Sequence, residues 1–169
     1  MKQINTPSQN LYAELLFKTL GAQLAGEGSA RAAAGVMAGT LAEGGIPSAS
    51  IVIQDGSGLS RMNLVSPEGT VALLAYMYQQ PDFRAFHESL PLAGREGTLA
   101  RRMRFTEAER QVRAKTGTLT HHINLSGYIT MPDGEVLAFA IMNNNSLCPV
   151  REVRRIQDEI CLQLLRLGR

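Results

Sequence analysis

The stretch RAKTGTLT, residues 113–120, decides the fold that we expect for this chain. It has the pattern of a β-strand, and two alternating apolar runs follow it at residues 124–130 and 135–143. The sequence PDG at residues 132–134 suits a tight turn, because proline presets the backbone and glycine adopts the unusual angle. The sequence therefore predicts three consecutive antiparallel strands. Gly117 in the first strand would let a second backbone lie close to it.

Helical patterns precede this sheet region. Thr6 and Pro7 have the residue types of an N-cap and a first helical position, and leucines then recur at near-helical spacing. Ser29 is a candidate cap for an alanine-rich helix at Ala30–Glu43, and Ser66 with its following proline begins another helix that ends near residue 80. The leucines of the first helix are Leu11, Leu15, Leu16, Leu20 and Leu24.

The last helix is predicted at Val150–Leu167, where apolar residues form one stripe and arginines occupy the opposite side. A helix of this kind packs on the face of a sheet. The fold class is therefore α/β in the broad sense and α+β in the strict one, an antiparallel sheet flanked by helices in a single domain, residues 1–169. The predicted stripe consists of Val153, Ile156, Ile160, Leu164 and Leu167.

Composition limits the possible partners. A chain of 169 residues is long enough for one domain with a real core. The formal charge is +2. So small a charge disfavours one possible function, that of a helical protein that binds nucleic acid through its arginines. No apolar run approaches the length of a membrane span, and the first residues do not resemble a signal peptide.

No pattern indicates a metal or a phosphate-bearing cofactor. Cys148 and Cys161 lack metal-ligand spacing, although a disulfide between them stays open. His121 and His122 are adjacent, so on a strand they point in opposite directions. The loop at residues 55–61 lacks the third glycine of a dinucleotide fingerprint, and we interpret it as a turn whose polar side chains satisfy local backbone groups. We expect no cofactor and no bound metal.

The residues around Gly117 suggest chemistry as well as structure. Lys115 and Thr116 offer a positive charge and a hydroxyl, which suits a substrate carboxylate. The backbone N–H of Thr118 could be an oxyanion donor for acyl transfer at a serine. A three-residue match is weak by itself, because an exposed strand with a solvated lysine has the same sequence.

Several motifs in one order make the pattern specific. They are SQN at residues 8–10, DGSGLSR at 55–61, LPLAG at 90–94, GTL at 97–99, AKTGTL at 114–119 and LSGY at 125–128. Together they resemble the penicillin-binding D-alanyl-D-alanine carboxypeptidase/endopeptidase family, peptidase family S13. The resemblance covers nearly the whole chain and implies a β-lactamase- or transpeptidase-like fold. It also implies a serine-type hydrolase of the periplasm or the outer face of the membrane, acting on peptidoglycan stem peptides and bound by β-lactams.

The resemblance implies a role for each matched residue. Ser8 would relay a proton to the leaving group, and Asn10 would hold the peptide carbonyl of the substrate. Lys115 would supply positive potential, and Thr116 would bind the terminal carboxylate of D-Ala-D-Ala. The other site residues are Gly117 and Thr118 in the substrate-binding strand, and Asp55, Ser57 and Arg61, which would order a loop near the cleft.

The family also requires the motif S-x-x-K, whose serine is acylated and whose lysine is the base. The chain has three lysines, Lys2, Lys18 and Lys115, and none stands three residues after a serine. We therefore expect this chain to be the C-terminal part of a penicillin-binding domain, incomplete at the N-terminal side and inactive alone. A missing N-terminal segment or a separate chain would supply S-x-x-K.

Two expectations follow from that incompleteness. The strand at residues 135–143 would lack its usual neighbours, and its bare apolar edge would promote self-association or pairing with the N-terminal piece. The alternative function is a non-catalytic module that binds peptidoglycan or a protein partner. An in-frame S-x-x-K directly upstream in the genome would favour the enzyme.

Overall fold

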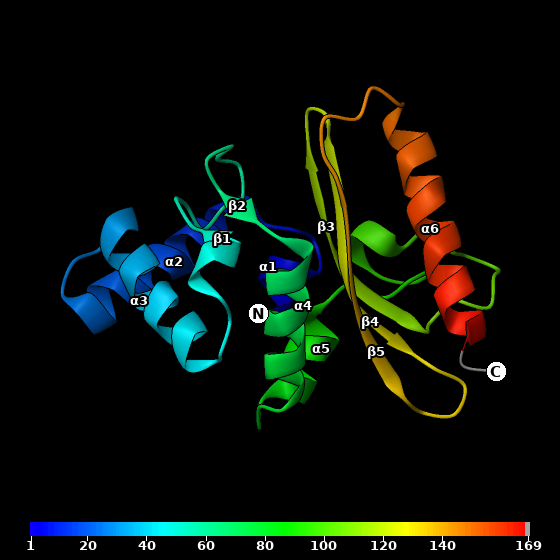
Figure 1. Cartoon of the computed structure of the whole chain (residues 1–169), viewed down its shortest axis with the longest axis horizontal. Helices are drawn as coiled ribbons and strands as arrows, with labels where there is room; N and C mark the ends of the chain where they lie inside the picture. The colour runs from blue at the N-terminus through cyan, green and yellow to red at the C-terminus, as the bar shows by residue number, and fades with distance from the viewer. Residues whose placement is uncertain (168–169) are drawn as a thin grey trace. The chain divides into compact units, whose positions relative to one another are not determined.

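The computed structural model describes residues 1–167 and divides into two compact units. The sheet unit contains Met1–Ser8 together with the chain from Gln79 onward, and the helical unit is Gln9–Tyr78 (Figure 1). The sheet unit therefore takes residues from both sides of the helical unit in the sequence.

The predicted three-stranded antiparallel sheet is confirmed. Its strands are β3 (Val112–Leu119), β4 (His122–Thr130) and β5 (Val136–Asn143), in the order β3-β4-β5. The turn between β4 and β5 has Gly134 at φ 91°, and the Gly134 N–H donates to the carbonyl of Met131 at 3.0 Å. Glycine allows this left-handed backbone at no steric cost, which explains the tight turn.

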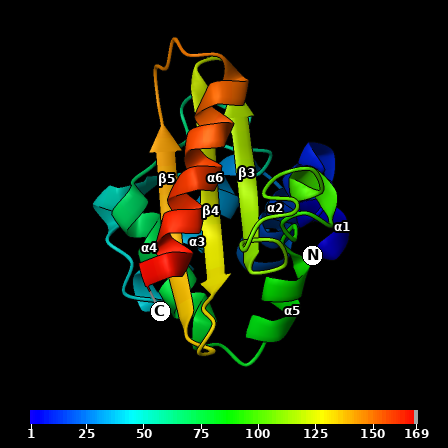
Figure 2. The ribbon, with the colours of Figure 1, turned by 90° about the vertical axis from the view of Figure 1, so that its right-hand side faces the viewer.

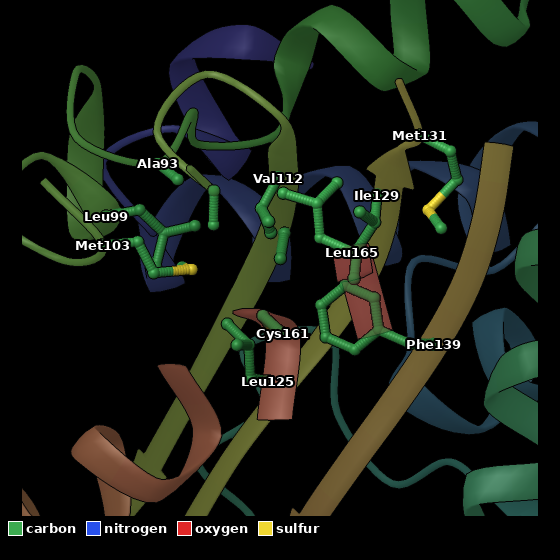
Figure 3. Close-up of a cluster of buried hydrophobic side chains, with 12 residues drawn as sticks. Ala93, Leu99, Met103, Val112, Leu125, Ile129, Met131, Phe139, Cys161 and Leu165 are labelled. Atoms are coloured by element: carbon green, nitrogen blue, oxygen red, sulfur yellow. The ribbon is translucent and has the colours of Figure 1, made fainter. Parts of the chain in front are cut away.

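Helix α6 (Val150–Leu167) lies across one face of this sheet (Figure 2). Leu125, Ile129 and Phe139 extend from the strands toward Cys161 and Leu165 of α6 (Figure 3). Burial of such side chains contributes roughly 1.5–3 kcal/mol each, so this layer is the main source of stability in the unit. The core cluster consists of Ala93, Leu99, Met103, Ala108, Val112, Ala114, Leu125, Ile129, Met131, Phe139, Cys161 and Leu165.

The bounds of α6 agree with the prediction, but the predicted apolar stripe is partly wrong. Ile156 and Ile160 are 47% and 37% exposed, and Leu167 is 80% exposed. The buried positions are Val153, Gln157, Cys161 and Leu165. The helix is turned so that a glutamine faces the core, and this is tolerated because the Gln157 amide donates to the carbonyl of Ile123 at 2.9 Å.

The first helix also differs from its prediction. The short helix α1 (Lys2–Asn5) ends before Pro7, and α2 (Asn10–Ala25) begins at Asn10. The Thr6 hydroxyl does not cap a helix but donates to the carbonyl of Ser89 at 2.8 Å. Ser89 ends helix α5 (Phe83–Ser89), which is followed by the 3-10 turn η2 (Gly97–Leu99).

The helical unit contains α2, α3 (Ala30–Glu43) and α4 (Pro67–Tyr78), with η1 (Ser48–Ser50) and a two-residue pair of strands, β1 (Ile51–Val52) and β2 (Leu64–Val65). The predicted caps are confirmed, since Ser29 and Ser66 accept from the N–H groups of Ala32 and Gly69. Of the predicted apolar residues of α2, Leu11, Leu15, Leu16 and Leu24 are exposed, whereas Phe17 and Gly21 are buried. Close packing against the start of α3 requires Gly21, because a Cβ there would lie 2.9 Å from the Ala33 nitrogen.

Both cysteines are free, Cys148 at the surface and Cys161 in the core. Within residues 1–167, no helix has the length and apolar character needed to cross a lipid bilayer.

Candidate functional site

The structure brings Ser8 and Lys115 together, although they are 107 residues apart in the sequence. Lys115 lies in the middle of β3, opposite Ser126 of β4. Its ammonium donates to the Ser8 hydroxyl at 2.6 Å and to the carbonyl of Thr116 at 3.1 Å. A lysine ammonium has three hydrogens, so one donor stays available for a third group.

Burial lowers the pKa of Lys115, because the charged form loses hydration. Within residues 1–167, no carboxylate forms an ion pair with this ammonium. The site therefore holds a partly desolvated positive charge next to a hydroxyl, an arrangement suited to an incoming anion.

The backbone of Ser8 is in the left-handed region, at φ 63°. This conformation costs a non-glycine residue about 1–2 kcal/mol, and it persists only where surrounding contacts enforce it. The strain occurs at the residue whose hydroxyl meets Lys115, so the fold fixes the direction of that hydroxyl at a cost in stability.

The two threonines after Lys115 have polar partners near the end of β3. The Thr116 hydroxyl donates to the hydroxyl of Thr98 at 2.9 Å. Arg154 of α6 donates to the Thr118 hydroxyl over a long 3.4 Å. The hydroxyls and the guanidinium together give this end of the strand the donors that a carboxylate needs.

Gly117 does not play the close-packing part that we expected. A Cβ at Gly117 would make ordinary contact with Asn124 at 3.6 Å. The close approach occurs at Gly127 of β4 instead, where a Cβ would lie 2.2 Å from the carbonyl oxygen of Arg113. Gly117 and Thr118 are exposed.

Asn10 belongs to the helical unit, where it is the first residue of α2. Its amide nitrogen donates to the carbonyl of Ser57 at 2.9 Å. This contact joins two predicted site residues, one from the SQN motif and one from the 55–61 loop. It leaves the second amide hydrogen and the amide oxygen of Asn10 for other partners.

Asp55 organises the 55–61 loop. Its carboxylate accepts from the side chains of Ser57 and Asn63 and from the backbone N–H groups of Gly58 and Ser60, at 2.7–3.1 Å. Burial opposes ionisation of Asp55, but these donors outweigh it and lower the pKa of the carboxyl. The loop is therefore held in one shape by an ionised aspartate.

The other loop residues have different surroundings. Gly56 lies against α2, since its N–H donates to Glu14 at 2.8 Å and a Cβ there would be 2.3 Å from Phe17. Arg61 is exposed at the far end of the loop. In residues 1–167, no three His, Cys, Asp or Glu side chains gather in a way that could hold a metal ion.

Comparison with known proteins gives the family. The model of the D-Ala-D-Ala carboxypeptidase 3 (S13) family matches residues 1–164. The chain belongs to the peptidase S13 family. The predicted family and its fold class are thereby confirmed, and the roles of individual S13 residues stay predictions.

Named relatives support the same assignment. The S13 chain is 42% identical over 162 residues to a D-alanyl-D-alanine carboxypeptidase of Actinomadura sp. strain R39, covering 93% of this chain and 30% of that protein. It is 33% identical over 147 residues to the D-alanyl-D-alanine carboxypeptidase DacB of Haemophilus influenzae, covering 82% of this chain and 30% of that protein. The chain thus spans about a third of the length of these relatives.

Solved structures agree. Penicillin binding protein 4 (DacB) of Haemophilus influenzae matches with a TM-score of 0.86 at 27% identity, over 97% of this chain and 38% of the other. The TLA-3 extended-spectrum β-lactamase matches with a TM-score of 0.74 at 19% identity, over 98% of this chain and 62% of that protein. At that identity the second match shows a shared fold alone.

Sequence reasoning gave no role to several residues that contact the predicted site residues or the segment before Ser8. Thr98 and Arg154 contact the threonines of β3, Asn63 contacts Asp55, and Ser89 accepts from Thr6. Asn63 alone had a local signal, because an asparagine near a turn aspartate often completes its hydrogen bonds. The others lie far along the sequence from their partners, and only the fold shows their proximity.

Proposed function

We propose that this chain forms one wall of the cleft of a serine-type D-alanyl-D-alanine carboxypeptidase/endopeptidase that acts on peptidoglycan stem peptides and binds β-lactams. The observation that carries the proposal is the 2.6 Å hydrogen bond from Lys115 to the Ser8 hydroxyl. It joins the serine of the SQN motif to the lysine of the AKTGTL motif, two of the motifs that carry the family resemblance.

The proposed reaction is acyl transfer in two steps. A serine of an S-x-x-K motif, in polypeptide outside residues 1–169, attacks the peptide carbonyl of D-Ala-D-Ala and gives its proton to the lysine of that motif. That lysine passes the proton to Ser8 while Ser8 gives its own hydroxyl proton to the departing amine; the C–N bond breaks and D-alanine leaves. Water then hydrolyses the acyl-serine ester and restores the hydroxyl.

Each site residue has a part that fits its surroundings. The Lys115 ammonium keeps positive potential at Ser8 and at the substrate carboxylate, which Thr116 and Thr118 bind through their hydroxyls. Asn10 holds the substrate carbonyl with the amide hydrogen that Ser57 does not use. Asp55 and Ser57 order the 55–61 loop, and we assign Arg61 to the exposed end of that loop.

A protein that acts on such a substrate works outside the cytoplasm, in the periplasm or on the outer face of the membrane. Peptidoglycan stem peptides and β-lactams are met there, and we propose the same location for this chain. The polypeptide that carries S-x-x-K would be its structural partner.

A labelled penicillin tests where the nucleophile lies. The 169-residue chain is incubated with a fluorescent penicillin, denatured and analysed on a gel. We expect no covalent label, because no lysine activates a serine three residues before it. Label that stays on Ser8, or on any other serine of the chain, would contradict the proposed division of the site.

The genomic sequence directly upstream separates the enzyme from the binding module. If it holds an in-frame S-x-x-K, the longer product should be acylated by penicillin, and Lys115→Ala should slow acylation by roughly 100-fold or more. Lys18→Ala is the control, because Lys18 pairs with Glu14 in the helical unit. Acylation that survives Lys115→Ala unchanged would overturn the role of Lys115. Absence of the motif upstream would favour a non-catalytic peptidoglycan-binding module.

A further inference from the structure

The Ser8 hydroxyl sits at the end of a strained segment, and that segment needs an anchor. Residues 1–8 contain one helical turn, α1, and end with Ser8 at φ 63°. A serine keeps a left-handed backbone only where surrounding contacts enforce it. Contacts from elsewhere in the sheet unit must therefore hold Ser8 in place.

Those contacts converge on Ser89, which is 1% exposed. The Asn5 amide donates to the Ser89 hydroxyl at 2.8 Å, and the Thr6 hydroxyl donates to the Ser89 carbonyl at 2.8 Å. The Ser89 hydroxyl in turn donates to the carbonyl of Phe86 at 2.6 Å. Two consecutive residues next to Pro7 and Ser8 are thus fixed to the end of α5.

A glycine completes this anchor. Gly97 has φ 54°, and a Cβ on it would lie 2.0 Å from the carbonyl oxygen of Thr6. The obstacle is backbone, which cannot rotate away. Only a residue without a side chain at position 97 lets Thr6 take its observed place, two residues before Ser8.

The same part of the chain also positions Lys115. The backbone N–H of Ala114 donates to the carbonyl of Pro91 at 3.1 Å, and Ala93 donates to Val112 at 2.9 Å. Arg113 donates to the carbonyl of Leu90 at 2.8 Å. The 89–97 segment is therefore fixed to Ser8 through Thr6 on one side and to Lys115 through Ala114 on the other.

We propose that Thr6, Ser89 and Gly97 are positioning residues, which hold the Ser8 hydroxyl against the Lys115 ammonium by seating residues 5–8 on the 89–97 segment. The proposal deepens the proposed function, since it assumes that this pair is the working one. The penicillin experiments test that function. The geometry of the Ser8–Lys115 pair can be measured in the 169-residue chain without the nucleophile. Failure of the positioning proposal can therefore be distinguished from failure of the proposed function.

Nuclear magnetic resonance of labelled lysine tests the proposal directly. The chain has three lysines, so Lys115 is assigned by the signal that Lys115→Arg removes. The readouts are the cross-peak between the Lys115 side chain and the Ser8 β-hydrogens, and the pH midpoint of the Lys115 amine. In Thr6→Val and Ser89→Ala we expect the cross-peak to be lost or reduced severalfold. The midpoint should shift, because moving Ser8 changes both the hydration of the ammonium and its hydrogen bond to the Ser8 hydroxyl.

Matched variants separate positioning from general loosening. Thr106→Val removes a hydroxyl-to-carbonyl bond of the same kind, from Thr106 to Met103, elsewhere in the sheet unit. Gly134→Ala adds a Cβ at another left-handed glycine that has open space around it, and it is compared with Gly97→Ala. Both controls should keep the wild-type cross-peak and midpoint. Thr6→Ser should keep them too, because serine retains the hydroxyl that donates to the Ser89 carbonyl.

Several outcomes would overturn the proposal. Folded Thr6→Val and Ser89→Ala with an unchanged cross-peak and midpoint would do so, as would an equal change in Thr106→Val. Circular dichroism shows whether each variant is folded. If Thr6→Val is unfolded, the cross-peak and midpoint of Ser89→Ala and Gly97→Ala test the proposal instead. Unfolding of all three would also count against it, because the proposal places their effect at Ser8 and not in the whole unit.

Discussion

At the scale of residues, two glycines on neighbouring strands differ in what a side chain would meet. A Cβ at Gly127 of β4 would lie 2.2 Å from the Arg113 carbonyl and 2.6 Å from the Ala114 Cα, both backbone atoms. A Cβ at Gly117 of β3 would lie 3.6 Å from the Asn124 side chain. The spacing of the β3–β4 pair therefore depends on Gly127 and not on Gly117.

Gly127→Ala should lower the free energy of unfolding by at least about 1–3 kcal/mol, because the added methyl group must push two strands apart. Gly117→Ala is the control. It should keep or slightly raise stability, because the added methyl group fits and glycine weakens a strand. Urea denaturation of both variants measures this. Equal destabilisation by the two substitutions would contradict the assignment.

His87 makes stability depend on pH. Its ring stacks on the Phe83 ring with 5.2 Å between the ring centroids. It makes a T-shaped contact with the Tyr128 ring, with 5.5 Å between the centroids. Burial, and then the positive charge of Arg113, lower the pKa of His87, while Glu88 acts in the opposite direction. The folded state therefore disfavours the imidazolium.

The sign follows from proton binding. As the pH falls through about 6.5, the unfolded chain protonates this histidine more readily than the folded chain does, so acid favours unfolding. His87→Gln should reduce the stability lost between about pH 8 and pH 5.5, measured by urea denaturation at each pH. Any loss of packing in the variant acts at both pH values and cancels in the difference. An identical loss in wild type and variant would refute the role of His87.

Sequence motifs identified the Ser8–Lys115 pair because the family resemblance matched both residues. They gave no role to Thr98, although it lies in the matched GTL stretch, or to Ser89 at the end of α5, because neither hydroxyl has a local signature of its function. Motifs mark the residues that chemistry requires, whereas the residues that position them depend on which loops the fold brings together.

At the scale of elements, α6 is fixed to the loop before β3 by a nearly buried ion pair. The Arg102 side chain is 10% exposed and donates to Asp158 at 2.6 Å, to Gln157 at 3.1 Å and to the carbonyl of Arg154 at 3.2 Å. Removing the cation would leave Asp158, 21% exposed, without its partner.

Arg102→Met should therefore cost roughly 3 kcal/mol of unfolding free energy, near the lower end for a broken buried pair because Asp158 keeps some water. Arg84→Met is the control, because Arg84 pairs with Glu88 at the surface and its side chain is 89% exposed. It should leave thermal unfolding nearly unchanged. A similar shift in the two variants would show that the buried pair is not special.

The strands and the last helix could be predicted within two residues, since alternation, a proline–glycine turn and amphipathic spacing are local signals. The start of α2 could not, because Thr6 and Pro7 match a cap in sequence but the Thr6 hydroxyl is bound to the carbonyl of Ser89. The orientation of α6 was missed for a similar reason. A hydropathy pattern places glutamine outside, and only the carbonyl of Ile123 explains why Gln157 is inside.

At the scale of the whole molecule, β5 is an open edge. Within residues 1–167 it pairs with β4 alone. Its sequence is largely apolar, and Leu137 is 36% exposed. An apolar edge strand with free backbone groups is a template for another strand.

We predict that the isolated chain self-associates, with an apparent mass that rises with concentration in light scattering. Leu137→Lys should reduce this association, because a charge beside the edge opposes strand pairing. Leu147→Lys is the control, since Leu147 is 90% exposed in the loop after β5. A strictly monomeric profile at every concentration would contradict the prediction.

The discontinuous sheet unit has a consequence for synthesis on the ribosome. Ser8 is made 107 residues before Lys115. At translation rates of about 5–20 residues per second, the delay between them is roughly 5–20 seconds. The nascent chain must keep residues 1–8 free of other contacts while all of Gln9–Tyr78 is produced. A chaperone that shields this segment during elongation would therefore raise the yield of correctly assembled protein.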